Sequence, residues 1–189
     1  MLRATQQFAW AKIGRPFTGN GRNLAYKKDE FFKRNGYINH MNILTGEDAL
    51  FINDAAGKKN TAICYTLESF TYSKAKKTFK SWAKEKRKAA FTASFFKPFD
   101  RLQLKLFIIS QAAFFILMIV LIAAQFNWMF LVPVIIIRYI GGWITMAQSA
   151  VRLNEKDVVY WYPVMEIIVI FTQLYVYTAN LTSKPVHWK

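Results

Sequence analysis

Two adjacent carboxylates, Glu47 and Asp48, are the first residues whose types and spacing could do chemistry. A carboxylate held at the junction of a loop and a helix can take the proton of a hydroxyl group and act as a general base. The same stretch also fits a capping box, in which Thr45 caps a helix and Asp48 returns a hydrogen bond three residues later. The spacing alone favours the cap and leaves the general base open.

A glycine-rich loop from Gly19 to Asn23 precedes this pair. Gly19 and Gly21 flank an asparagine, so the backbone can take positive φ and let another group approach closely. The loop is either a plain turn, which is the simpler interpretation, or a ligand-binding loop. In the second case Gly19, Gly21, Arg22 and Asn23 would contact the ligand.

A basic and aromatic segment, residues 74–101, contains Trp82, Glu85 and Lys88. We expect residues 74–96 to form a helix whose aromatic side chains and lysines suit the surface of an anionic membrane. Nucleic acid is the alternative partner for a chain of formal charge +15. The apolar region that follows this segment favours lipid headgroups, so we expect a membrane partner and no nucleic acid.

Metal-binding side chains are scarce. The chain has 2 histidines and 1 cysteine, Cys64, and it contains no Asp-x-Asp sequence. The sequence therefore predicts neither a metal site within this chain nor an internal disulfide.

Helices and short strands are expected to position these residues. Four helices are predicted, at residues 2–13, 29–35, 45–57 and 74–96. Three short strands are predicted, at residues 23–26, 61–67 and 70–73. The expected fold class is therefore an α+β cytoplasmic part, within residues 1–73, followed by transmembrane helices.

Three apolar runs make up most of the second half of the chain, at residues 106–124, 128–150 and 158–181. A spanning helix needs about 20 mostly apolar residues, so we predict three transmembrane helices within residues 102–181. Most of the basic residues lie before Leu106, and basic residues next to a first span stay in the cytoplasm. We therefore expect a multi-pass membrane protein with a cytoplasmic N-terminal part. Its tail, residues 182–189, would then lie outside.

Arg138 and Glu166 are the only formal charges deep in these runs. A charge at the middle of a span costs about 2.5–3.5 kcal/mol and usually pairs inside the helix bundle. Their depths differ by roughly 5 Å at ~1.5 Å per residue, which is within reach of an arginine. We expect an ion pair, while separate contacts with water or a groove for a polymer or lipid acceptor stay open.

Four stretches occur in order: Gly19-x-Gly21-Arg22-Asn23-Leu24-Ala25-Tyr26-Lys27, Phe32…Gly36-Tyr37, Gly46-Glu47-Asp48-x-Leu50-Phe51 and Trp82-x-x-Glu85-Lys86-x-Lys88. With the apolar runs behind them, they make the chain resemble the C-terminal half of a membrane-bound family 2 glycosyltransferase. The likeness is closest to bacterial enzymes of the Bacteroidetes type, related to the cellulose and poly-N-acetylglucosamine synthases.

The resemblance implies that residues 1–73 are the C-terminal half of a cytoplasmic GT-A-like α/β domain. Such enzymes transfer a sugar from a nucleotide sugar to a glycan or lipid acceptor, with inversion, in cell-surface polysaccharide or glycolipid synthesis at the inner membrane. Asp48 would be the general base, with Glu47 as its neighbour. The substrates would contact Gly19, Gly21, Arg22, Asn23, Trp82, Glu85 and Lys88.

The chain departs from the family pattern. The family has Gln-x-x-Arg followed by Trp or His where this chain has Glu85, Lys88 and Ala89, and Ala49 replaces an acidic residue. A glutamate repels a diphosphate, and a lysine lacks the bidentate grip of arginine. The Asp-x-Asp that holds a divalent Mg or Mn ion belongs to the half that would precede Met1.

Two functions therefore stay open. In the first, the chain is part of a glycosyltransferase, and a further segment or a separate chain supplies the N-terminal catalytic half. The 189 residues alone would then be inactive. In the second, the chain is a non-catalytic membrane subunit or remnant whose basic face binds anionic lipid or a partner protein.

Overall fold

The computed structural model describes residues 2–43 and 45–183, which fall into two compact units. One unit, called the membrane unit, combines the chain up to Thr5 with Leu102–Gln173. The other, called the basic unit, combines Gln6–Arg101 with the chain from Leu174 onward. The sequence prediction for residues 184–189 lies outside the described residues.

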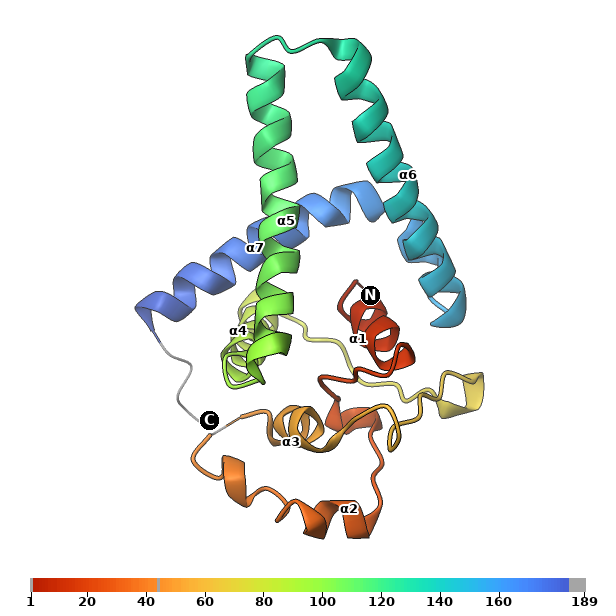
Figure 1. Cartoon of the computed structure of the whole chain (residues 1–189), viewed down its shortest axis with the longest axis vertical. Coiled ribbons are helices and arrows are strands. Elements are labelled where there is room, and N and C mark those ends of the chain that lie inside the picture. The colour runs from red at the N-terminus through yellow and green to blue at the C-terminus, as the bar shows by residue number, and fades with distance from the viewer. Residues whose placement is uncertain (1, 44, 184–189) are drawn as a thin grey trace. The chain divides into compact units, whose positions relative to one another are not determined.

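Helices make up both units. They are α1 (Leu2–Lys12), α2 (Lys28–Lys33), α3 (Glu47–Ala55), α4 (Phe79–Ala93), α5 (Pro98–Ala123), α6 (Trp128–Arg152) and α7 (Tyr162–Thr182) (Figure 1). Short 3-10 turns lie at Gly21–Asn23, Ile38–His40, Leu67–Ser69 and Lys156–Val159. Each predicted helix is present with shifted ends. The largest shift is at α4, which begins at Phe79 because the Thr78 side chain accepts a hydrogen bond from the backbone N–H of Ser81.

The predicted strands do not occur in the described residues, so the expectation of an α+β part is wrong. Residues 61–66 run without regular structure and are mostly exposed, and a 3-10 turn follows at Leu67–Ser69. An extended segment becomes a strand only when the backbone of a neighbouring segment pairs with it. Within the described part of the chain, no segment forms such a ladder with residues 23–26, 61–67 or 70–73.

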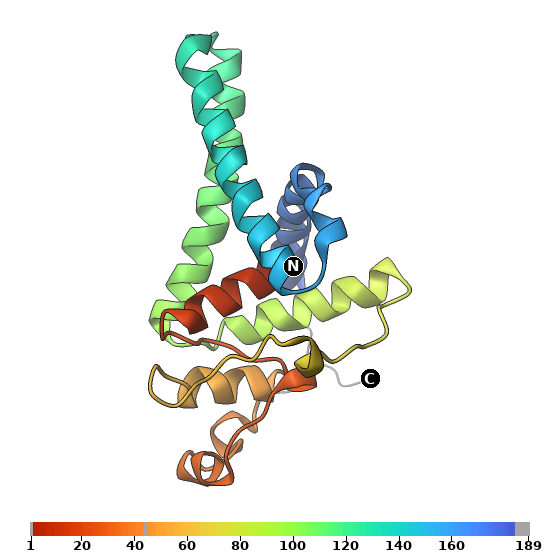
Figure 2. The ribbon, with the colours of Figure 1, turned by 90° about the vertical axis from the view of Figure 1, so that its right-hand side faces the viewer.

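The start of α3 also differs from the predicted capping box. The N-cap is Gly46 rather than Thr45, with a left-handed φ of 82° and no side-chain capping bond. The Thr45 hydroxyl instead lies 3.3 Å from the hydroxyl of Thr92 in α4. A Cβ at Gly46 would come within 2.4 Å of Thr92, so glycine is required where α3 meets α4 (Figure 2).

The core of the basic unit is held together by apolar and polar contacts around α3. The buried rings of Phe17 and Phe96 lie 6.3 Å apart. The buried amide of Asn53 donates to the Phe17 carbonyl and to the Asp100 carboxylate. It also accepts a hydrogen bond from the backbone N–H of Lys97. Because a buried amide is costly unless it is bonded, these contacts fix α3 against the segment that begins α5.

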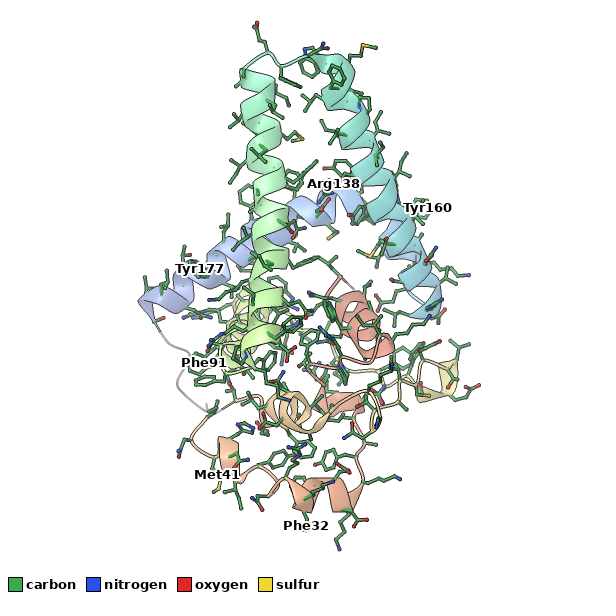
Figure 3. The ribbon with its side chains drawn as sticks, in the orientation of Figure 1. Phe32, Met41, Phe91, Arg138, Tyr160 and Tyr177 are labelled. Carbon is green, nitrogen blue, oxygen red and sulfur yellow. The ribbon has the colours of Figure 1, made fainter. Side chains whose placement is uncertain are left out.

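Three helices, α5, α6 and α7, are long and apolar enough to cross a membrane. In the membrane unit, α5 and α6 form a hairpin that is joined at residues 124–127 and opens away from this turn (Figure 1). Many of their large apolar side chains are exposed and point outward (Figure 3), as a lipid surrounding requires. The chain therefore has the features of a multi-pass membrane protein.

The ion pair expected between Arg138 and Glu166 is present in the membrane unit. Arg138 Nη1 lies 2.9 Å from Glu166 Oε2, and Nη2 contacts Oε1 of the same carboxylate. The guanidinium also lies over the ring of Phe114, 4.3 Å from its centroid. Both charges are thus paired within a largely apolar surrounding.

Replacing either partner of this pair alone should destabilise the chain by leaving the other charge unpaired. Replacing both should cost less than the two single losses added together. Arg138→Leu or Glu166→Leu leaves one charge buried alone, a loss of about 3–5 kcal/mol, whereas the double variant leaves none. In thermal unfolding of the full chain in detergent, we expect the loss for the double variant to be smaller than the sum of the single losses. Strictly additive losses would contradict a stabilising contact between the two side chains.

Candidate functional site

The carboxylate of Asp48 lies against the glycine-rich loop. Glu47 and Asp48 are the first two residues of α3 and are partly exposed. A Cβ at Gly21 would lie 1.9 Å from Asp48 Oδ2, so the carboxylate occupies the space that a larger residue would need. The loop thus allows the close approach that its glycines predict, and the approaching group is Asp48.

Two tyrosines connect Asp48 to an aromatic cluster. The Tyr37 hydroxyl donates to Asp48 Oδ1 at 3.3 Å and lies 2.8 Å from the Tyr26 hydroxyl. The hydrogen bond with Tyr26, followed by burial and the charge of Asp48, raises the pKa of Tyr37 above its usual range. Tyr37 therefore keeps its proton as the pH rises. Phe31 and Phe51 pack against both tyrosine rings.

Arg22 connects the loop to α4. Its Nη2 lies 3.1 Å from Glu85 Oε1, and its Nη1 donates to Ser73 Oγ at 3.1 Å. Lys76 Nζ lies 3.9 Å from the other oxygen of Glu85. Since Arg22 and Glu85 are half exposed, the pair contributes at most about 1 kcal/mol. Its role is to hold the loop beside α4.

Further contacts hold the loop on its other sides. A Cβ at Gly19 would lie 2.9 Å from Ile52 Cγ1 of α3. The Asn23 side-chain amide donates to the Ser69 carbonyl at 3.0 Å, and the Thr71 hydroxyl donates to the Arg22 carbonyl at 3.2 Å. The structure thus brings Gly19, Gly21, Arg22 and Asn23 together with Asp48 and Glu85.

The remaining predicted residues lie along α4. Trp82 precedes Glu85 by about one helical turn, and Lys88 follows Glu85 by about one turn. The Trp82 ring lies 5.6 Å from the ring of Phe79 and carries the Lys86 ammonium at 5.5 Å from its centroid. Trp82 therefore packs within an aromatic and basic face of α4, while Glu85 reaches the loop.

The sequence gives no sign of the contacts that Tyr26, Tyr37 and Arg87 make. The two tyrosines lie within the four stretches, but their spacing on either side of α2 gives no sign that their hydroxyls meet. Arg87 Nε donates to Asn180 Oδ1 at 3.0 Å, and Nη2 donates to the Ala179 carbonyl at 2.7 Å. No periodicity connects positions this far apart in the sequence.

The residues of this site do not fit a divalent metal. In the described ranges, no group of three His, Cys, Asp or Glu side chains comes together. Glu85 faces two cations, and Asp48 faces a tyrosine hydroxyl and a glycine backbone. No step of a reaction can therefore be assigned to a metal ion held by these residues.

No protein-family model, curated protein or solved structure matches the chain.

The close contact between the Asp48 carboxylate and Gly21 can be tested directly. In Gly21→Ala, the added methyl group would overlap the Asp48 carboxylate, and such overpacking typically costs about 1–3 kcal/mol. Gly57→Ala is the matched control, because a Cβ at Gly57 would meet nothing nearer than 3.8 Å. By thermal unfolding of the full chain, we expect a clear loss for Gly21→Ala and about 0.5 kcal/mol or less for Gly57→Ala. Equal losses of stability in the two variants would show that the Asp48 carboxylate does not lie against Gly21.

Proposed function

We propose that this chain is the acceptor-side part of an inverting, membrane-bound glycosyltransferase, with Asp48 as the general base. The observation that carries the proposal is that two of the other stretches contact the Asp48 carboxylate and that one of these two also contacts the fourth stretch. Gly21 seats Asp48, Tyr37 donates to it, and Arg22 of the same loop holds Glu85 of α4. Segments far apart in the sequence thus surround one group that can accept a proton.

Asp48 would carry out one proton transfer, as the acceptor of the proton. Asp48 takes the proton of an acceptor hydroxyl while that oxygen bonds to the anomeric carbon of the donor sugar. The bond from this carbon to the diphosphate breaks, and the nucleoside diphosphate leaves with the electron pair. Tyr37 holds Oδ1 of the carboxylate, which leaves Oδ2 on the side of the glycine-rich loop.

Donor binding is proposed to involve residues outside the described site. A divalent ion would enter with the nucleotide sugar on ligands from a further segment or a separate chain. The basic unit would then be cytoplasmic at the inner membrane, as the placement of its lysines and arginines before the first span favours. The sugar could be transferred to a growing glycan or to a lipid.

A second candidate is a non-catalytic membrane subunit. The observation that favours it is the chemistry of α4, which carries several lysines beside an exposed Phe79. Such a helix suits the headgroups of an anionic leaflet or an acidic partner protein. In this case Asp48 would only fix the loop, and its charge would be unnecessary for any turnover.

Neutralising Asp48 separates the two candidates. In native membranes, Asp48→Asn should lower sugar transfer from labelled nucleotide sugars into lipid or polymer by about 100-fold or more, because general bases typically contribute this much. The matched control is Asp54→Asn, which alters a carboxylate of the same helix that pairs with His40. It should keep transfer within about twofold. Normal transfer by an equally abundant Asp48→Asn protein would favour the subunit.

A further inference from the structure

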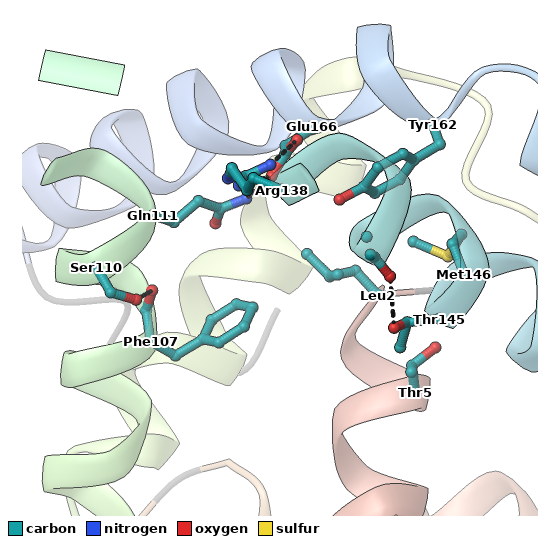
Figure 4. A pocket seen from close by; sticks show the side chains of 12 residues that line it. Leu2, Thr5, Phe107, Ser110, Gln111, Arg138, Thr145, Met146, Tyr162 and Glu166 are labelled. Atoms are coloured by element: carbon teal, nitrogen blue, oxygen red, sulfur yellow. Dashed lines mark hydrogen bonds and ion pairs between the residues drawn. The ribbon is translucent and has the colours of Figure 1, made fainter. Parts of the chain in front are cut away.

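A polar hollow lies within the membrane unit. Its volume is ≈ 350 Å³, and it is bounded by α5, α6, the beginning of α7 and the first residues of α1 (Figure 4). Its polar lining consists of Thr5, Ser110, Gln111, Arg138, Thr145, Tyr162 and Glu166. Small-molecule sites span about 300–1,000 Å³, so this hollow suits a group the size of one sugar ring.

The charges of the hollow cancel. Arg138 and Glu166 are paired, and Glu166 is only 5% exposed. A phosphate or carboxylate entering the hollow would meet this carboxylate, and an ammonium group would meet the guanidinium. The pair therefore favours a neutral ligand.

The free hydrogen-bonding capacity of the hollow consists mainly of acceptors. Gln111 is only 7% exposed, and its Nε2 donates to Glu166 at 3.3 Å, whereas its Oε1 is buried without a hydrogen-bond partner among the residues that the structure describes. The hydroxyls of Ser110 and Thr145 donate to the carbonyls of Phe107 and Gly141, so their oxygens keep only acceptor capacity. A buried acceptor without a donor is costly, and a ligand hydroxyl would supply one.

The hollow lies near one end of the apolar part of each helix. Gln111 is about 8 Å along α5 from Leu106, and Thr145 is about 11 Å from Arg152 at the end of α6, at ~1.5 Å per residue. The beginning of α5 and the end of α6 lie at the same end of the helical hairpin, so both residues lie near that end. A polar group at this depth is just below the headgroup region of one leaflet, and apolar chains attached to it would reach the lipid.

We propose that this hollow binds the neutral, hydroxyl-bearing headgroup of a lipid. The ligand donates to Gln111 Oε1 and to the oxygens of Ser110 or Thr145, while Tyr162, whose hydroxyl points into the hollow, offers a further contact (Figure 4). A single sugar or a glycerol unit has this chemistry. The binding does not depend on the role of Asp48.

Lipid retention by the full chain tests this proposal. Native mass spectrometry would compare monoglucosyl diacylglycerol and monoacylglycerol with phosphatidylglycerol, which is anionic, and triacylglycerol, which has no hydroxyl, each added at the same concentration to the purified protein. We expect at least one of the first two lipids to be retained about tenfold more than the last two. Retention of phosphatidylglycerol or triacylglycerol at the same level would overturn the proposal.

A pair of glutamine variants localises the binding. Gln111→Leu removes the buried acceptor and should lower retention of the preferred lipid about fivefold or more. Gln103→Leu makes the same change in α5 at a residue that does not line the hollow, and it should leave retention unchanged. Circular dichroism would verify equal helix content. Equal retention by Gln111→Leu and the parent chain would place the lipid elsewhere and refute the assignment.

Discussion

The contact between the Asp48 carboxylate and the backbone at Gly21 is the constraint on which the candidate site depends. A Cβ at Gly21 would lie 1.9 Å from Asp48 Oδ2, so α3 and the glycine-rich loop can approach this closely only because residue 21 is glycine. Tyr37 and Arg22 then have fixed positions, because each contacts one side of the same junction. The geometry makes the Asp48 carboxylate both a structural contact and an acidic group presented at the loop.

The membrane unit obeys a different constraint, since the lipid offers no water to its polar groups. Its buried charges are paired, and most of its hydroxyls donate to backbone carbonyls one turn earlier in their own helices. Gln111 Oε1 stands out because it is buried and unpaired next to the ion pair. Gln103 shares this feature in the same helix, so the unpaired amide alone does not define a site. The hollow beside Gln111 and its neutral, acceptor-rich lining add the necessary second observation.

The sequence predicts those parts of the fold that depend on local patterns. Apolar length places α5, α6 and α7, and two isolated charges in these runs predict the ion pair of Arg138 and Glu166. The prediction of a strand at 61–67 is wrong because alternation of apolar and polar residues is a property of one segment, whereas a strand also needs a second segment to pair with. The capping box failed because the Thr45 hydroxyl meets Thr92, 47 residues away. Contacts of this kind, like that of Arg87 with Asn180, leave no periodic signal in the sequence.

Glu85 shows how a contact between residues distant in the sequence changes the electrostatic interpretation of a single position. A glutamate at this position repels a diphosphate if its charge stands alone. In the structure, Arg22 lies 3.1 Å from one carboxylate oxygen and Lys76 lies 3.9 Å from the other. The three side chains together carry one net positive charge. Because Arg22 comes from the loop that seats Asp48, the same contact that offsets Glu85 also orients the loop beside α4. Glu85 is therefore electrostatically compatible with an anion near this site, although the contact itself contributes little stability.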